Sequence, residues 1–266
     1  MEMPTPLSPN YRLTIQFSLG GLSFVLFDTA KQMVADMELH QSDTLNNSDE
    51  LFRTLEKDLN SRDLSNLQSV ICLIDGRTNA LVPEPLYRSD DKNKLLGFSF
   101  DIPNNYIVEA DFIDSLRIYN LYGYPDALRN YILKKWPQAE IHHSTSVFLK
   151  NLPKSEIPTV HVHVRNRDFD LAIMKDQLLF FNNFKFQTKV DFSYYLLFAM
   201  QQHELSGLDT TVQFSGLIQP SSEIIELCRR YVKDIRFVTK PESFKVKETF
   251  HEVPFQYYYN HYQILK

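Results

Sequence analysis

Glycine is scarce in this chain, with 7 residues among 266. Enzymes that hold phosphates in glycine-rich loops need backbone positions without a Cβ atom, so this scarcity argues against that class of enzyme. Cysteine is rarer still, and both residues, Cys72 and Cys228, stand inside apolar patterns. Their spacing fits no metal site, so we interpret them as buried free thiols in a reducing compartment.

Clustered positive charge and long apolar runs are also missing. The net charge is -5 and the pI is near 5.9, which argues against nucleic acid as the main partner. No apolar run reaches the roughly 18 residues that a membrane span needs. The first ten residues, MEMPTPLSPN, are polar and contain proline, unlike a signal peptide. The sequence therefore predicts a cytoplasmic protein.

Aromatic residues are abundant instead, with 20 Phe and 14 Tyr, and 43% of the chain is hydrophobic. Such a chain can bury a core, and its length suits one large domain or two of ordinary size.

The first half begins with the pattern of a β-meander. Apolar residues alternate with polar ones along Leu13–Phe27, on both sides of Gly20–Gly21, which predicts a hairpin. Residues 33–39 continue the alternation as a third strand. A helix capped by Ser48 or Asp49 should follow, with Leu51, Phe52, Leu55 and Leu59 on one face. The apolar run Val70–Ile74 predicts a covered strand.

Residues 77–122 are less regular, and we interpret them as a mostly β insertion, with one strand in the alternating stretch 96–102. Pro125 suits the first turn of a helix whose apolar stripe ends at Trp136. A short strand at 139–142 and a short helix at 145–151 are expected next.

The second half repeats the order of the first. Its expected elements are strands at 160–164, 169–173 and from 178, a helix capped by Asp191, a strand at 211–214, a helical stripe of Ile224, Cys228 and Tyr231, and a strand at 235–238.

Matching elements support an internal duplication. The offset is 147 between Leu13 and Val160 and 140 between Asp75 and Ser215, and it falls to 96 between Ala139 and Ile235. The drop of 44 falls on the irregular stretch 77–122. Each unit is therefore predicted as β-β-β-α-β-α-β, the first over residues 1–153 with the insertion and the second over 154–266 with an aromatic tail.

A meander followed by αβαβ, present twice, resembles the actin-like ATPase fold, an α/β fold built from two ribonuclease H-like units. The segments LTIQFSLGGLSFVLFD, VDFSYYLLFAMQQ and VQFSGLIQPSSEIIELCRRYVKDIRF resemble a bacterial family of degenerate actin-like proteins known mainly from Bacteroidetes. The resemblance covers essentially the whole chain, and it extends more distantly to the actin-like proteins of pilus and secretion assembly.

The resemblance implies a nucleotide site with two phosphate hairpins and an adenosine turn. The first hairpin keeps Gly20 and Gly21 but has Ser18 where an acid is expected. The second contains Arg165, Asp168 and Asp170 and has no glycine. Arginine attracts anions, but bulky side chains deny the close backbone approach that phosphate binding uses.

The third motif, at Ser215 and Gly216, has one glycine where a pair is usual, followed by Leu217. We therefore expect a non-catalytic actin-like protein that acts as an interaction or scaffold module, with no cofactor. Its partner is an unknown protein or a second copy of the chain. The alternative is a divergent ATP-binding protein or kinase that still binds ATP and Mg²⁺ weakly.

Four other features have a structural explanation that we prefer. His161 and His163 have the spacing of two metal ligands on a strand, but no third ligand is near and polar alternation explains them. Asp168 and Asp170 resemble a catalytic carboxylate pair, yet salt bridges with the nearby arginines are simpler. His142–His143 is expected at the surface. The aromatic residues of 250–262 are expected to pack on the second half, with an interface as the alternative.

Overall fold

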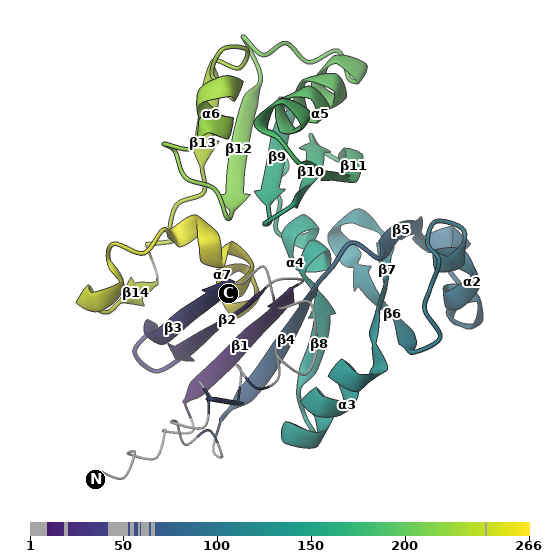
Figure 1. Ribbon diagram of the computed structural model, residues 1–266, viewed down its shortest axis with the longest axis vertical. Coiled ribbons are helices and arrows are strands. Elements are labelled where there is room, and N and C mark those ends of the chain that lie inside the picture. The colour runs from purple at the N-terminus through teal and green to yellow at the C-terminus, as the bar shows by residue number, and fades with distance from the viewer. Residues whose placement is uncertain are drawn as a thin grey trace. The chain divides into compact units, whose positions relative to one another are not determined.

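The computed structural model describes residues 10–18, 21–41, 53, 56–57, 59, 64, 67–242 and 244–266. The chain divides into two compact units (Figure 1). The first unit runs to Val147 and also includes Glu242–His251 and Asn260–Lys266, and the second comprises Phe148–Pro241 and Glu252–Tyr259.

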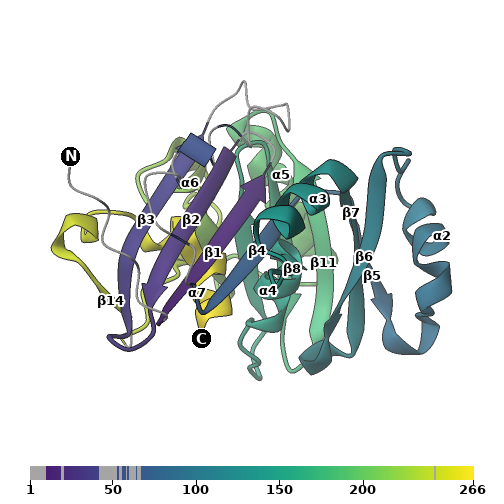
Figure 2. The same cartoon turned by 90° about the horizontal axis from the view of Figure 1, so that it is seen from below.

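The first unit contains a six-stranded sheet in the order β14-β3-β2-β1-β4-β8, whose strands lie side by side in Figure 2. Its strands are β1 (Tyr11–Ser18), β2 (Gly21–Asp28), β3 (Met33–Gln41), β4 (Ser69–Asp75), β8 (Glu140–His143) and β14 (Lys245–Val246). The meander β1-β2-β3 is antiparallel, whereas β4 is parallel to both β1 and β8. The predicted strands of this half are confirmed.

Both faces of this sheet are buried. On one face, residues such as Leu13, Ile15 and Phe17 join a core with Leu128 and Ile132 of α3 (Asp126–Lys135). On the other face, Ile71 and Leu73 pack with Val147 of α4 (Ser144–Lys150) and Ile264 of α7 (Tyr259–Leu265). The helix expected after Ser48 falls mostly outside the described residues.

The insertion forms a separate three-stranded sheet, in the order β5-β7-β6. Its strands are β5 (Asn79–Pro83), β6 (Tyr106–Ile113) and β7 (Ile118–Pro125), with short 3-10 helices at Glu84–Leu86, Ser89–Asp91 and Asp114–Leu116. The strand predicted over 96–102 is wrong, because Lys92–Gly97 forms α2. Leu96 is buried from this helix, while Phe98, which the alternation placed on the same face, is 75% exposed.

The second unit contains a five-stranded sheet in the order β11-β10-β9-β12-β13. Its strands are β9 (Thr159–Val164), β10 (Asp168–Met174), β11 (Leu178–Lys185), β12 (Thr211–Gly216) and β13 (Asp234–Phe237). When the strands are numbered in chain order within each sheet, both sheets have the order third-second-first-fourth-fifth, with β14 added to the first sheet.

Two helices cover the core face of the second sheet. Buried residues of α5 (Lys189–Gln202) and α6 (Glu223–Cys228) pack with Val160, Val162 and Val164. Thr188 caps α5, and Asp191 occupies the third helical position of a capping box, where its carboxylate accepts from the Thr188 backbone N–H. The prediction that Asp191 is the N-cap residue is therefore wrong, because Thr188 is the N-cap and Asp191 is the third residue of the helix in the same capping box.

The C-terminal tail contributes to both units. Phe255–Tyr258 forms a 3-10 helix in the second unit, where the Gln256 side chain donates to the Ile218 carbonyl at 3.0 Å. In the first unit, β14 extends the sheet beside β3, and Phe244 packs on Tyr262. A further 3-10 helix covers Glu248–Phe250. The expectation that the tail packs on the second half alone is therefore corrected. Across the described segments, none of the helices is long and apolar enough to cross a membrane.

Candidate functional site

Polar side chains gather where parallel strands end, at the carboxyl edge of each sheet. This is the edge at which open α/β sheets bind ligands. In the first unit, β1 and β4 run parallel and end side by side, so that Ser18 and Asp75 are direct partners in the register.

Asp75 is a buried carboxylate at the first carboxyl edge. Gln16 Nε2 donates to its Oδ2 at 3.0 Å, and Ser144 Oγ donates to its Oδ1 at 2.5 Å. In the comparison of the two halves, Asp75 served only as a reference position for the offset. The sequence signal for its place in the site is an acid at the carboxyl end of a strand beside the first hairpin.

The first hairpin uses Ser18 and Gly21 to build the turn itself. Ser18 Oγ donates to the Gly21 carbonyl at 3.0 Å, so the hydroxyl closes the hairpin. A Cβ atom on Gly21 would lie 2.4 Å from the His40 carbonyl oxygen of β3. Glycine is needed here because two strands approach closely, which explains its presence without a phosphate. Gly20 lies outside the described residues.

The second carboxyl edge holds a cluster of buried charges around Arg165. Its guanidinium donates twice to Asp170, through Nη1 at 3.0 Å and Nη2 at 2.6 Å, and once to Asp168, through Nε at 2.5 Å. Asn183 of β11 donates to Asp168 at 3.1 Å and to Asp170 at 2.9 Å. The preferred interpretation of this acidic pair, a salt bridge, is confirmed for Arg165, whereas Asn183 had no signal in the sequence.

The electrostatics of Asp170 follow from this geometry. Burial by itself would raise its pKa, but the Arg165 charge and the hydrogen bonds from Arg165 and Asn183 lower it to about 2. The carboxylate is therefore ionised at neutral pH. Asp168 and Asp170 together compensate the charge of the Arg165 guanidinium.

Ser215 and Gly216 end β12 at the same edge. Gly216 has φ +82°, and a Cβ atom there would lie 2.1 Å from the Val164 carbonyl oxygen of β9. The next residue, Leu217, donates its backbone N–H to that same oxygen at 2.7 Å. As with Gly21, a strand contact accounts for the glycine. Ser215 Oγ bonds His163 Nδ1 at 2.9 Å.

The histidines of β9 are buried, contrary to the polar-face interpretation. Their face is covered within the second unit, where the His163 ring lies 5.6 Å from Phe148 and 6.3 Å from Tyr259. Burial lowers the pKa of His161 to about 4 and that of His163 to about 3, so both are neutral. No cluster of metal-ligating residues occurs in the described ranges.

The His142 side chain is 36% exposed, but His143 is buried, which corrects the surface position expected for His143. Its backbone N–H donates to Asp111 Oδ2 at 2.7 Å, and the neighbouring His142 Nδ1 bonds Asp111 Oδ1 at 3.1 Å. Asp111 belongs to β6, so this carboxylate ties the insertion to the edge of the first sheet. Its hydrogen bond raises the pKa of His142, against the lowering by burial.

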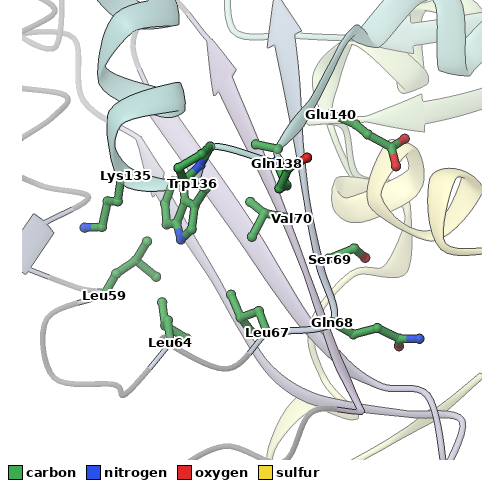
Figure 3. A pocket seen from close by; sticks show the side chains of 12 residues that line it. Leu59, Leu64, Leu67, Gln68, Ser69, Val70, Lys135, Trp136, Gln138 and Glu140 are labelled. Atoms are coloured by element: carbon green, nitrogen blue, oxygen red, sulfur yellow. The ribbon is translucent and has the colours of Figure 1, made fainter.

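A pocket of about 620 Å³ lies elsewhere in the first unit. Figure 3 shows Trp136 beside it, with Leu59, Leu64 and Leu67 along one side. Lys135 Nζ sits 5.3 Å from the Trp136 ring centre. The described residues that line the pocket include none of the predicted site residues.

The sequence of the chain matches one family profile over residues 3–235. That family is described as a protein of unknown function, DUF3822. The chain belongs to this family. No curated protein matches the chain.

Solved structures establish the fold of this DUF3822 member. A Bacteroides thetaiotaomicron protein with actin-like ATPase fold and unknown function has a TM-score of 0.75 at 16% identity, over 87% of this chain and 91% of that one. The PilM-PilN type IV pilus biogenesis complex gives a TM-score of 0.61 at 8% identity, over 95% and 96%. The chain therefore has the actin-like ATPase fold, as the sequence analysis expected.

Proposed function

We propose that this protein is a non-catalytic actin-like protein that acts as an interaction or scaffold module. The observation that carries this proposal is the state of Arg165, whose guanidinium is held by Asp168 and Asp170. A cation neutralised in this way offers no charge to a transferring phosphoryl group, and phosphoryl transfer depends on positioning and charge stabilisation.

The two described glycines of the motifs support the same proposal. Gly21 and Gly216 each make room for a carbonyl oxygen of a neighbouring strand. Close packing against a neighbouring strand thus explains why glycine occupies both positions. A degenerate nucleotide site, made of Ser18, Gly20, Gly21, Arg165, Asp168, Ser215 and Gly216, is consistent with a fold that was kept after its chemistry was lost.

A divergent ATP-binding protein or kinase is the second candidate, and Asp75 favours it. This acid lies at a carboxyl edge, in register with Ser18 of the first hairpin. A carboxylate at such a place suits a Mg²⁺ ion or a water molecule. In this structure its oxygens accept from Gln16 and Ser144, so Mg²⁺ would have to replace those bonds.

Nucleotide binding and turnover separate the two candidates. We expect no rise in melting temperature with millimolar ATP and Mg²⁺, since a bound ligand stabilises by RT ln(1 + [L]/Kd). We also expect no phosphate release. A Mg²⁺-dependent ATPase activity lost in Asp75→Asn or Asp168→Asn, but kept in the exposed control Asp234→Asn, would establish the second candidate and overturn the first.

Two further aspects of the proposal concern origin and partners. The common strand order of the two sheets supports an internal duplication. The related PilM structure contains PilN, and binding a protein partner is the mode of action we propose for this chain. We also propose a cytoplasmic location and, as before, no nucleic-acid partner.

A further inference from the structure

Strand β8 forms one edge of the first sheet, since among the described strands it pairs only with β4. An edge strand presents backbone N–H and C=O groups that can pair with another strand. Two such groups of β8 are occupied by side chains instead. The His143 N–H donates to Asp111 Oδ2 at 2.7 Å, and the Ile141 carbonyl accepts from Tyr122 Oη at 3.3 Å.

Both of these side chains come from the insertion, where Asp111 belongs to β6 and Tyr122 to β7. Ile141 and His143 are two positions apart, so their backbone groups point to the same side of β8, away from β4. The insertion therefore closes this edge with a carboxylate and a hydroxyl in place of a neighbouring strand. We call the contacts of Asp111 and Tyr122 with β8 the Asp111 latch.

The His142 ring contacts the Asp111 latch from the exposed side. Its Nδ1 lies 3.1 Å from Asp111 Oδ1, and its Nε2 lies 3.5 Å from Glu140 Oε2. A carboxylate accepts hydrogen bonds and donates none, so both contacts are favourable only when both ring nitrogens carry hydrogen. That form is the imidazolium. The side chain is 36% exposed, so its proton can exchange with solvent.

The charged groups that face this ring among the described residues are Asp111 of β6 and Glu140 of β8. Tyr122 of β7 lies against Asp111 and stays protonated, because burial and the nearby carboxylates raise its pKa. The Asp111 hydrogen bond raises the pKa of His142 above its ordinary value of 6.5, against the lowering by burial. The imidazolium is therefore present at low pH and is lost as pH rises through that raised value.

We propose that the Asp111 latch is pH-sensitive: protonated His142 keeps it closed, and loss of that proton frees the Ile141 carbonyl and the His143 N–H at the edge of β8. A charge-assisted hydrogen bond is about twice as strong as a neutral one, so neutral His142 holds Asp111 more weakly. The freed groups make β8 an edge that another strand can extend. This regulation does not depend on the proposed scaffold function.

Hydrogen exchange of the His143 amide in the full chain, followed by NMR, measures the latch directly, because this N–H donates to Asp111. The protection of the amide, corrected for the intrinsic exchange rate at each pH, should fall about tenfold between about pH 6 and 9 in the wild type. Amides of the central strand β1 should keep their protection, which separates opening of the latch from global unfolding.

Two substitutions of His142 fix the latch in opposite states. His142→Arg carries a permanent positive charge, so the protection of the His143 amide should stay high across the range. His142→Asn supplies a neutral amide donor and should give low protection without pH dependence. The exposed His251→Gln is the control and should titrate like the wild type. A wild-type circular dichroism spectrum would show that each variant is folded.

Protection of the His143 amide that does not change with pH in the wild type would overturn the inference. The same fall in His142→Arg as in the wild type would overturn it as well, since a different group would then titrate. An equal fall in the amides of β1 would show global unfolding and contradict a local latch. None of these results bears on the proposed absence of catalysis, which ATP turnover tests separately.

Discussion

His261 bonds Thr14 across 247 positions of sequence, with 2.8 Å between its Nδ1 and the Thr14 Oγ1. Its other ring nitrogen, Nε2, lies 2.8 Å from Ser23 Oγ. A neutral imidazole has one donor and one acceptor nitrogen, so it can satisfy both hydroxyl groups. This buried contact holds α7 to β1 and β2 within the first unit.

The stability of the first unit should fall in mild acid because of His261. Burial lowers its pKa to about 3 from the ordinary value of 6.5. A group with a depressed pKa contributes stability above the unfolded pKa and loses it as pH falls, here from about 6.5 toward 3. The slope from one such histidine is about 1.4 kcal/mol per pH unit. Urea unfolding followed by the fluorescence of Trp136, the single tryptophan, measures it.

His261→Gln removes the titrating group, so the pH dependence of the unfolding free energy should decrease by the contribution of one proton, about 1.4 kcal/mol per pH unit. The exposed His251→Gln is the control and should keep the wild-type slope. An unchanged slope in His261→Gln would show that His261 does not couple folding to pH.

Asp170→Asn should destabilise the second unit strongly. The substitution leaves the buried Arg165 with less compensating charge, and breaking a buried ion pair costs about 3–5 kcal/mol. Asp234→Asn removes a carboxylate from a solvent-exposed pair with Arg236, where the expected loss is much smaller. Chemical unfolding followed by circular dichroism compares the two.

The Asp170 carboxylate should also make the stability of the second unit depend on pH in strong acid. Because the pKa of Asp170 is depressed to about 2 from the ordinary 3.8, its stabilisation is present above pH 3.8 and is lost as pH falls through 2. Equal unfolding curves for Asp170→Asn and Asp234→Asn would contradict the role we give to the Arg165 cluster.

Gly216→Ala should lower stability by more than about 2 kcal/mol. The left-handed backbone costs a residue with a Cβ about 1–2 kcal/mol, and contact with the Val164 carbonyl adds strain. Gly97→Ala is the control, since a Cβ there meets nothing within 4 Å. It should change stability by less than about 1 kcal/mol. If both variants unfold alike, the strand contact does not explain Gly216.

His142 should show the opposite pH dependence to His261. The Asp111 hydrogen bond raises its pKa, so its stabilisation is present below the unfolded pKa and is lost as pH rises through the folded one. An NMR titration of the His142 ring measures this directly. Asp111→Asn should lower the pKa of His142 more than Glu140→Gln does, because the Glu140 contact is longer, at 3.5 Å. A larger effect of Glu140→Gln would reverse this assignment.

Local patterns were enough to predict most strands. The alternation in 13–27 and 160–173 fixed which residues share a face, and the turns fixed the meanders, because both depend on neighbouring residues. The same reasoning failed at 96–102, where four apolar residues at even spacing turned out to lie in and after a helix. A period of two over so short a stretch does not exclude a helical turn.

The site was only partly predictable. Arg165, Asp168 and Asp170 are close in sequence, so their salt bridges could be expected, whereas Asn183 joins them through the pairing of β11 with β10. Asp75 gained its place beside Ser18 only through the parallel pairing of β1 and β4.

The sequence by itself determined the two meanders and the order of their strands and helices, because these depend on local spacing and residue type. Tertiary structure alone decided what covers each face. It buried His163 and His261 against segments distant in sequence, and it paired Met33 and Val34 of β3 with β14. Alternation along a strand says which side chains point together, but only long-range packing decides whether they meet water or protein.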